Sequence, residues 1–300
     1  MTDGVLVMAY GTPASLDEIE AYYTDIRGGR APSPDDLAEL TGRYRVIGGH
    51  SPLREITRAQ ATGIGERVGA PSYVGMKHSA PFIADALARM NAEGIGRAVG
   101  LVLAPHYSSM SVGDYERRAR AAASEVGWSG ELKMIPNWHD EEGFVALLAE
   151  RVNAALSRLT DATRAEAVVL FSAHSLPTRI LEQGDPYPAQ LDATAQLVAA
   201  AAGLERWQVA WQSAGKTADP WLGPDICEVL VELAAKGVPG VVVCPCGFVA
   251  DHLEVLYDID IEAAALAHDL EIELVRTASL NDDPAFLDVL AGVVRRALDK

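Results

Sequence analysis

The sequence has few cysteines, few basic residues and no long apolar run, and these shortages exclude several classes of protein. Its three cysteines are unevenly spaced among 300 residues, which does not make the disulfide framework of a small secreted domain. No apolar run approaches the roughly 20 residues that a transmembrane helix needs. The N-terminus, MTDGVLVMAYG, has an acid and no basic region, unlike a signal peptide. We therefore expect a cytoplasmic globular protein with no integral membrane segment.

The shortage of basic residues makes the chain strongly acidic. It has 25 Lys and Arg against 42 Asp and Glu, which gives a net charge of -17. Such a charge argues against nucleic acid or an anionic membrane as the main partner. Residues 27–58 depart from the rest, with six arginines and four acids. This net charge of +2 fits either an anion-binding segment or a mixed helix surface with ordinary ion pairs, and the pattern leaves both open.

Several cofactor and catalytic motifs are missing. The first apolar strand is followed by MAYGTP, with a single glycine, so a dinucleotide-binding G-x-G-x-x-G is not present. The chain has no P-loop and no G-x-S-x-G nucleophile elbow. Cys244 and Cys246, with only Cys227 besides, fall short of the four thiolates of a usual iron–sulfur cluster. We expect a structural role for these cysteines.

What the chain does have is a regular alternation of apolar strands and helices. This alternation is typical of an α/β fold with parallel sheets covered on both faces. The predicted strands are 4–10, 72–76, 98–104, 131–135, 167–173, 207–211, 240–245 and 271–276. The predicted helices are 81–93, 112–126, 144–159, 187–202, 224–236, 252–267 and 284–298.

The pattern occurs twice, which predicts two similar halves with a cleft between them. GVLVMAYGTP has the layout of AVVLFSAHSLP, and VLAPHYSSM that of VCPCGFVAD. We place the domains at residues 1–150 and 151–300, and the sequence leaves open whether the last helix packs back on the first domain. The first connection, from residue 11 to 72, is long enough to be a functional insertion. It reads as helices at 16–26 and 34–44 followed by a loop, IGGHSPL.

Candidate site residues lie at the carboxyl ends of strands, where open α/β sheets bind ligands. His174 ends one strand in SAHSLP, and Tyr10 stands at the corresponding point of the other half. The alternative for His174 is a loop histidine satisfied by backbone groups. Glu254, Asp258 and Glu262 follow a third strand at i, i+4, i+8 spacing. Such a row is either a solvated face or a ladder of oxygen ligands for a divalent cation.

The longest motifs resemble the ferrochelatase family, and more closely the coproporphyrin III ferrochelatases of monoderm bacteria. They are LVMAYGTP, YYTDIRGGR, RYRVIGGHSPL, GMKHSAPFI, LAPHYSSMSV, FSAHSLP, GDPYP, WQSAGKTADPWLGPD and GFVADHLEVLYDID. The resemblance covers essentially the whole chain. It implies two Rossmann-like domains, each a four-stranded parallel sheet flanked by helices, with a porphyrin cleft between them. It also implies insertion of ferrous iron into coproporphyrin III, with release of two pyrrole protons, in haem biosynthesis.

The resemblance also assigns roles to single residues. His174 and Glu254 match the pair that binds the incoming metal and takes part in proton removal. Tyr10 matches an axial ligand of the product iron, where protoporphyrin-type relatives commonly have Met. Arg43, Asp258 and Glu262 match a possible outer cation site. Residues that match positions around the macrocycle and its propionates are Arg27, Arg43, Tyr44, Ser51, Tyr115 and, in the cleft wall, Trp211.

Iron is a substrate under this reading, and no prosthetic group is expected. Some actinobacterial relatives carry a [2Fe–2S] cluster on a C-terminal extension, but no cysteine follows Cys246 here, so no cluster is predicted. The expected partners are coproporphyrin III, Fe²⁺ and transiently other haem-pathway enzymes, and a monomer is expected. The alternatives are a protoporphyrin IX ferrochelatase, another tetrapyrrole chelatase such as a cobalt chelatase, and a non-catalytic haem or porphyrin carrier. A carrier would need Tyr10 but not the pair of His174 and Glu254.

Overall fold

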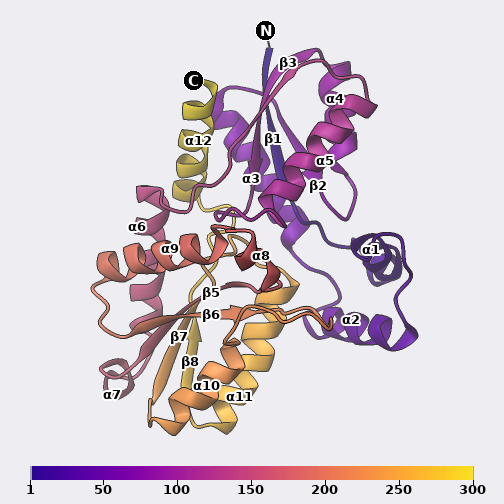
Figure 1. Cartoon of the computed structure of the whole chain (residues 1–300). Coiled ribbons are helices and arrows are strands. Elements are labelled where there is room, and N and C mark those ends of the chain that lie inside the picture. Colours follow the sequence, from indigo (N-terminus) through magenta and orange to yellow (C-terminus); the bar gives the residue numbers. More distant parts are fainter. Residues whose placement is uncertain (1, 300) are drawn as a thin grey trace.

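The computed structural model describes residues 2–299 as two stacked α/β halves (Figure 1), each built on a four-stranded parallel sheet. The first sheet has the order β2-β1-β3-β4 and the second the order β6-β5-β7-β8, so the two halves share one topology. This confirms the predicted fold class. The strands are β1 (Thr2–Ala9), β2 (Ser72–Met76), β3 (Ile95–Val102), β4 (Glu131–Met134), β5 (Val168–His174), β6 (Trp207–Gln212), β7 (Gly240–Cys244) and β8 (Glu273–Arg276).

The central strands form because their side chains are apolar on both faces. In β7 all five residues are buried, and in β1 the last six are. Strands of this kind lie between two layers of helices, as parallel sheets do. Their carboxyl ends point toward the junction of the two halves, so loops that leave β1, β5 and β7 meet there (Figure 1).

The long first connection holds three helices, one more than predicted. The three helices are α1 (Ile19–Ile26), α2 (Pro34–Val46) and α3 (Leu53–Val68). A short 3₁₀ helix, η1 (Leu16–Glu18), comes before α1. Ser33 caps α2 by accepting a hydrogen bond from the amide of Asp36, and Pro34 occupies the first turn. Figure 1 shows α1 and α2 standing beside the body of the molecule, whereas α3 packs on the first sheet.

Two further helices, α4 (Ile83–Ala92) and α5 (Val112–Glu125), complete the first half. The next helix, α6 (Glu142–Leu156), packs against the second sheet and α9 (Tyr187–Ala202). The predicted domain boundary at residue 150 therefore falls inside a helix that already belongs to the second half. The remaining helices of that half are α7 (Asp161–Arg164), α8 (Arg179–Glu182), α10 (Ile226–Ala235) and α11 (Ala264–Asp269).

The last helix, α12 (Pro284–Leu298), returns to the first half and packs along α3. Gly63 permits this close approach, because a Cβ atom there would lie 2.5 Å from Leu287 Cδ1. The N-terminal strand and the C-terminal helix thus lie at the same end of the molecule (Figure 1). The second half is inserted between two parts of the first.

The acidic row does not lie on an α-helix as predicted. Residues Val255–Ala263 form a π-helix, η2, in which the amide of Ala264 bonds the carbonyl of Ile259, and Glu254 stands at its N-terminus. In a π-helix the hydrogen bonds run from i to i+5, and such turns often occur at functional sites. Val255, Ile259 and Ala263 face the core of the second half, which places the neighbouring acids along the edge of that buried row.

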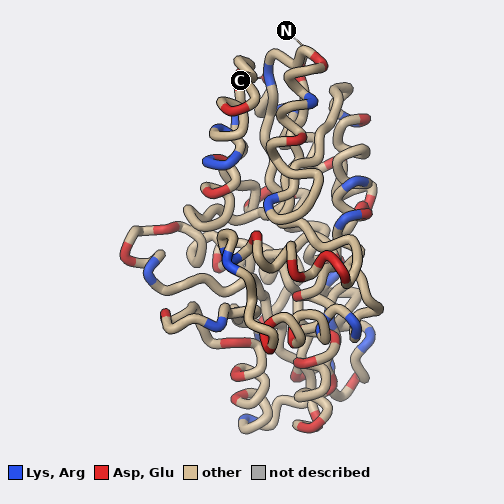
Figure 2. The backbone as a smooth tube through the Cα atoms, turned by 90° about the vertical axis from the view of Figure 1, so that its right-hand side faces the viewer, with Lys and Arg blue, Asp and Glu red and all other residues tan. Residues whose placement is uncertain are grey.

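Charged residues are spread over the molecule. Figure 2 shows Asp and Glu distributed over both halves, with Lys and Arg among them. Within residues 2–299, no helix has the length and apolar character to cross a bilayer.

Candidate active site

A cavity of about 320 Å³ lies where the carboxyl ends of the two sheets meet. Its walls come from both halves and from the first connection. Tyr10 and Lys77 belong to the first sheet's loops, Ser51 to the connection, and His174 and Glu254 to the second half. The cavity therefore occupies the position that the repeated pattern predicted for a ligand.

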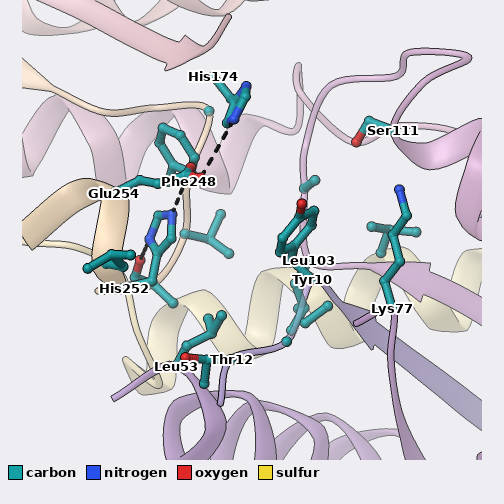
Figure 3. Close-up of a pocket in the computed structure, with 18 of the residues that line it drawn as sticks. Tyr10, Thr12, Leu53, Lys77, Leu103, Ser111, His174, Phe248, His252 and Glu254 are labelled. Carbon is teal, nitrogen blue, oxygen red and sulfur yellow. Dashed lines mark hydrogen bonds and ion pairs between the residues drawn. The ribbon is translucent and has the colours of Figure 1, made fainter. Parts of the chain in front are cut away.

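On one wall, two histidines flank a single carboxylate. His174 Nε2 lies 3.6 Å from Glu254 Oε1, and His252 Nε2 lies 3.6 Å from Glu254 Oε2. Figure 3 shows the three side chains converging, with both contacts dashed. The side chains of His174 and Glu254 are about a third exposed, at 35% and 32%, so both are accessible from the cavity. The structure thus brings together His174 and Glu254, as the sequence predicted, and adds His252.

Both histidines are held in one tautomer by the backbone. The Nδ1 atom of His174 lies 2.5 Å from the carbonyl oxygen of Ser175, and that of His252 lies 3.0 Å from the carbonyl oxygen of Ala250. A carbonyl only accepts, so each Nδ1 carries a hydrogen and donates it. The Nε2 atom of each ring is therefore the one that gains or loses a proton, and both Nε2 atoms face Glu254.

The charges of this wall are coupled. Burial alone would lower the pKa of His174, but the negative charge of Glu254 and its hydrogen bond raise that pKa to about 8. For Glu254 burial acts to raise the pKa, and the positive His174 outweighs it, so the pKa lies well below its ordinary value. At neutral pH the two side chains therefore form an ion pair that holds one proton on His174.

Asn281 anchors the loop that carries Glu254. Its side chain accepts a hydrogen bond from the amide of Asp251 at 2.8 Å and donates one to the Asp251 carboxylate at 2.9 Å. Ser279 and Arg276 bind the other oxygen of Asp251. Asn281 adopts the left-handed conformation, with φ of 47°. These contacts fix the backbone three residues before Glu254.

Tyr10 stands across the cavity from the histidines (Figure 3). It follows β1, and Gly11 turns the chain with φ of 95° at a point where a Cβ atom would meet Ser79 Oγ at 2.5 Å. The Tyr10 ring packs on His78, with centroids 4.6 Å apart, and His78 Nδ1 lies 2.6 Å from Asp25. Burial among these walls, with the charge of Glu254, raises the pKa of Tyr10 above its ordinary value. Tyr10 is therefore a neutral phenol at neutral pH.

The other predicted substrate-binding residues divide into two groups. Tyr44, Ser51 and Tyr115 line the cavity, and Tyr44 shares a hydrogen bond of 3.1 Å with Thr12. Arg27 and Arg43 lie outside its immediate lining. Arg27 forms an ion pair with Asp36 at 3.7 Å. Arg43 contacts the second half of the molecule. It forms an ion pair with Asp258 at 3.5 Å, and its guanidinium carbon lies 4.8 Å from the centroid of the Tyr257 ring.

The tryptophan of the cavity wall is not the one predicted. Trp211 is 6% exposed and packs in the core beside Tyr187, outside the lining of the cavity. Trp221 lines the cavity instead, with its ring centroid 6.5 Å from that of His174. Trp211 faces inward because it lies in the buried last three residues of β6, whereas Trp221 follows in a loop.

Sequence reasoning also missed His252 and Lys77. Both stand in motifs that resemble the family, GFVADHLEVLYDID and GMKHSAPFI, but neither side chain has a separate signal in the sequence. Asp258, further along η2, is buried, and this burial raises its pKa to about 6 despite a hydrogen bond from Ser213. Glu262 is exposed.

Within residues 2–299, no three His, Cys, Asp or Glu side chains are arranged to hold a metal ion together. Cys244 and Cys246 are buried, and burial raises the pKa of the Cys244 thiol to about 12, so it is an inert core residue.

Two solved structures share this arrangement of sheets. A sirohydrochlorin chelatase from Bacillus subtilis subspecies spizizenii in complex with cobalt matches with a TM-score of 0.58 and 13% identity, over 100% of this chain and 96% of that one. The Bacillus subtilis protein SirB with Fe³⁺ matches with a TM-score of 0.63 and 14% identity, over 99% and 96%. This chain therefore shares the fold of these two proteins.

Sequence relatives are much closer. The ferrochelatase family model matches residues 2–298. A ferrochelatase from Herpetosiphon aurantiacus is 45% identical over 97% of each chain. A coproporphyrin III ferrochelatase from Geobacillus thermodenitrificans is 46% identical over 100% of this chain and 97% of its own. This chain belongs to the ferrochelatase family and is an enzyme of that family, which confirms the resemblance drawn from the motifs.

Proposed function

We propose that this enzyme inserts Fe²⁺ into coproporphyrin III, forming the iron complex and releasing two protons. The observation that carries the proposal is the wall in which two Nε2 atoms flank the carboxylate of Glu254, facing Tyr10 across the cavity. Full-length relatives with the name coproporphyrin III ferrochelatase, at 44–46% identity, support the choice of porphyrin. We infer that it acts in the cytoplasm as a monomer, with transient contacts to other enzymes of haem synthesis.

His174 and His252 accept the two pyrrole protons in this mechanism. At rest His174 is protonated and paired with Glu254. When Fe²⁺ reaches the carboxylate, its charge replaces that of the imidazolium, and the proton on His174 Nε2 passes to solvent, to which this side chain is about a third exposed. The free Nε2 lone pairs then face the macrocycle. Each pyrrole N–H bond breaks as an Fe–N bond forms, and each proton passes to the Nε2 atom of one of the two imidazoles.

Glu254 holds the incoming ion close while water is shed, because its carboxylate lies between the two histidines and contacts both. Tyr10 approaches the iron of the product from the opposite face. The cation replaces the phenol proton, which is otherwise tightly held. Binding of the macrocycle between rigid walls also supplies energy to bend it out of plane, so that its nitrogens face the metal.

Asp258, Glu262 and Arg43 form the proposed outer cation site. Asp258 is buried within η2, and Arg43 at 3.5 Å supplies positive charge there. A divalent cation would take over that neutralising role. Asp258→Asn should then abolish stabilisation of the fold by millimolar Mg²⁺ in thermal unfolding, and an equal Mg²⁺ effect in both proteins would contradict the site.

An anaerobic spectrophotometric assay tests the main proposal. Fe²⁺ is added to the enzyme with coproporphyrin III or with protoporphyrin IX, and a control contains no metal. Faster turnover of coproporphyrin III is expected. Preference for protoporphyrin IX would favour a protoporphyrin IX ferrochelatase. Binding of either porphyrin without metal insertion would favour a non-catalytic carrier.

A further inference from the structure

Three cations surround one carboxylate at the edge of the cavity. Asp114 Oδ2 lies 2.6 Å from Lys77 Nζ and 3.0 Å from Arg118 Nε, and Asp114 Oδ1 lies 3.0 Å from an Arg117 nitrogen. Arg118 also donates to the backbone carbonyl of Lys77 at 3.5 Å. The group carries a net charge of +2 in a chain whose net charge is -17. We name Lys77, Asp114, Arg117 and Arg118 the Asp114 cluster.

The Asp114 cluster opens onto the cavity through Lys77. The Lys77 side chain is 11% exposed and lies among the cavity-lining residues, as do Tyr10, Ser111 and Tyr115. Its Nζ atom stands 5.9 Å from the Tyr10 ring centroid and 5.4 Å from that of Tyr115. Figure 3 shows the amino group beyond Tyr10, on the side away from His174 and Glu254. The positive charge therefore lies beside the cavity and away from His174 and Glu254 (Figure 3).

The neighbouring acids Glu116 and Asp25 are paired with other side chains and do not neutralise the net positive charge of the Asp114 cluster. Glu116, the next acid on α5, is paired with Arg120 at 2.8 Å, and Asp25 is bound to His78. Lys77 is largely removed from water, and this burial lowers its pKa despite the contact with Asp114. A buried ammonium between two aromatic rings gains most from a second anionic partner, because the surrounding medium screens charge weakly.

We propose that the Asp114 cluster binds one carboxylate arm of the porphyrin, with Lys77 as the direct contact and Arg118 as the second charge. This rests on the proposed function. Ser51 and Tyr44 line the same cavity from the first connection, where Tyr44 is hydrogen-bonded to Thr12, whereas Lys77 lines it from the loop after β2. A porphyrin with carboxylates on only one edge cannot reach both places. A tetracarboxylate such as coproporphyrin III can, so Lys77 and Arg118 determine specificity for it over a dicarboxylate.

The test compares Lys77→Met and Arg118→Gln with Arg120→Gln, a matched control on the same helix that pairs with Glu116 away from the cavity lining. KM and kcat for Fe²⁺ insertion are measured with coproporphyrin III and protoporphyrin IX. Lys77→Met should raise KM for coproporphyrin III about tenfold, the usual effect of one lost charge-assisted hydrogen bond. The kcat should stay within about twofold, and KM for protoporphyrin IX should change less. Lys77→Arg should restore part of the affinity.

An unchanged ratio of the two KM values in Lys77→Met and Arg118→Gln, relative to Arg120→Gln, would overturn the proposal. Arg118 is 43% exposed, so its replacement tests the proposal even if Lys77→Met folds poorly. Quenching of porphyrin fluorescence without metal gives the dissociation constants directly. If the wild-type enzyme fails to insert iron into coproporphyrin III, the proposed function fails, whereas the binding ratio still reports on the Asp114 cluster.

Discussion

The side-chain amide of Gln60 donates a hydrogen bond of 2.7 Å to the backbone carbonyl of Asn281, which links α3 of the first half to the anchor of the Glu254 loop. Gln60 is fully buried and lines the cavity. Asn281 in turn holds Asp251 by two side-chain hydrogen bonds. The position of Glu254 relative to the first half, and so relative to Tyr10, is therefore set through Asn281.

Replacing Asn281 tests this linkage. Asn281→Gly keeps the left-handed backbone and the bond from Gln60 but removes both contacts to Asp251. We expect kcat for iron insertion to fall about 10- to 100-fold through misplacement of Glu254, with KM for the porphyrin within about twofold. Asn281→Ala should lose about 1–2 kcal/mol more of unfolding free energy, because alanine tolerates a positive φ poorly. Steady-state kinetics and urea unfolding measure both effects, and an unchanged kcat in both variants would remove Asn281 from the active-site framework.

Loss of the proton-accepting wall should stop catalysis but not binding. His174→Ala is expected to lower iron insertion by at least about 100-fold, because general base catalysis alone typically contributes 10²–10⁴. Binding of metal-free coproporphyrin III should survive within severalfold. His268→Ala, at an exposed position on α11, is the control. Turnover by His174→Ala at the wild-type rate would rule out the role given to His174.

The ion pair of His174 and Glu254 predicts a pH window for stability. The folded pKa of His174 is raised to about 8, above its ordinary value, so its contribution is complete below about pH 6.5 and is lost as the pH rises through 8. The pKa of Glu254 is lowered, so its contribution is present above its ordinary pKa and is lost as the pH falls. The unfolding free energy of the wild type should therefore exceed that of His174→Gln most between about pH 5 and 6.5.

The size of this difference is about 1 kcal/mol, because both side chains are about a third exposed and solvent screens the pair. Urea midpoints at pH 6 and pH 9 measure it. A difference between wild type and His174→Gln that grows from pH 6 to pH 9 would have the wrong sign for this ion pair.

Tyr10 is tested by the spectrum of the bound product. Tyr10→Phe keeps the ring against His78 and removes only the oxygen, whereas Tyr10→Met supplies a thioether. Both changes should shift the Soret band of the iron product, and in different directions, if the phenol oxygen is the axial ligand. Thermal unfolding should change little for Tyr10→Phe. An unchanged Soret band in both variants would mean that Tyr10 does not bind the iron.

The fold followed from the sequence because its strands are apolar on both faces. All eight strands lie within three residues of their predicted bounds. The helix α3 was not predicted, because its glycines and mixed polar residues hide any apolar stripe. The need for glycine at position 63 becomes clear only when α12 is packed against α3. The π-helix was also invisible, because a change from i+4 to i+5 hydrogen bonding leaves no mark in residue spacing.

The candidate site was only partly predictable for a related reason. Strand ends identify His174 and Tyr10, since the ends of parallel strands converge. Whether a nearby loop residue points inward depends on tertiary contacts. His252 faces Glu254 because its Nδ1 is tied to the carbonyl of Ala250. Trp221 rather than Trp211 lines the cavity because β6 directs Trp211 into the core.

The packing of α12 on α3 also has a consequence for synthesis on the ribosome. The face of α3 around Gly63 stays uncovered until Leu287 has been translated, and the whole second half of the chain precedes that residue. At roughly 5–20 residues per second, the delay is on the order of ten seconds. The nascent first half is therefore an incomplete unit with an open apolar seam, and its folding finishes only when almost the entire chain has left the exit tunnel.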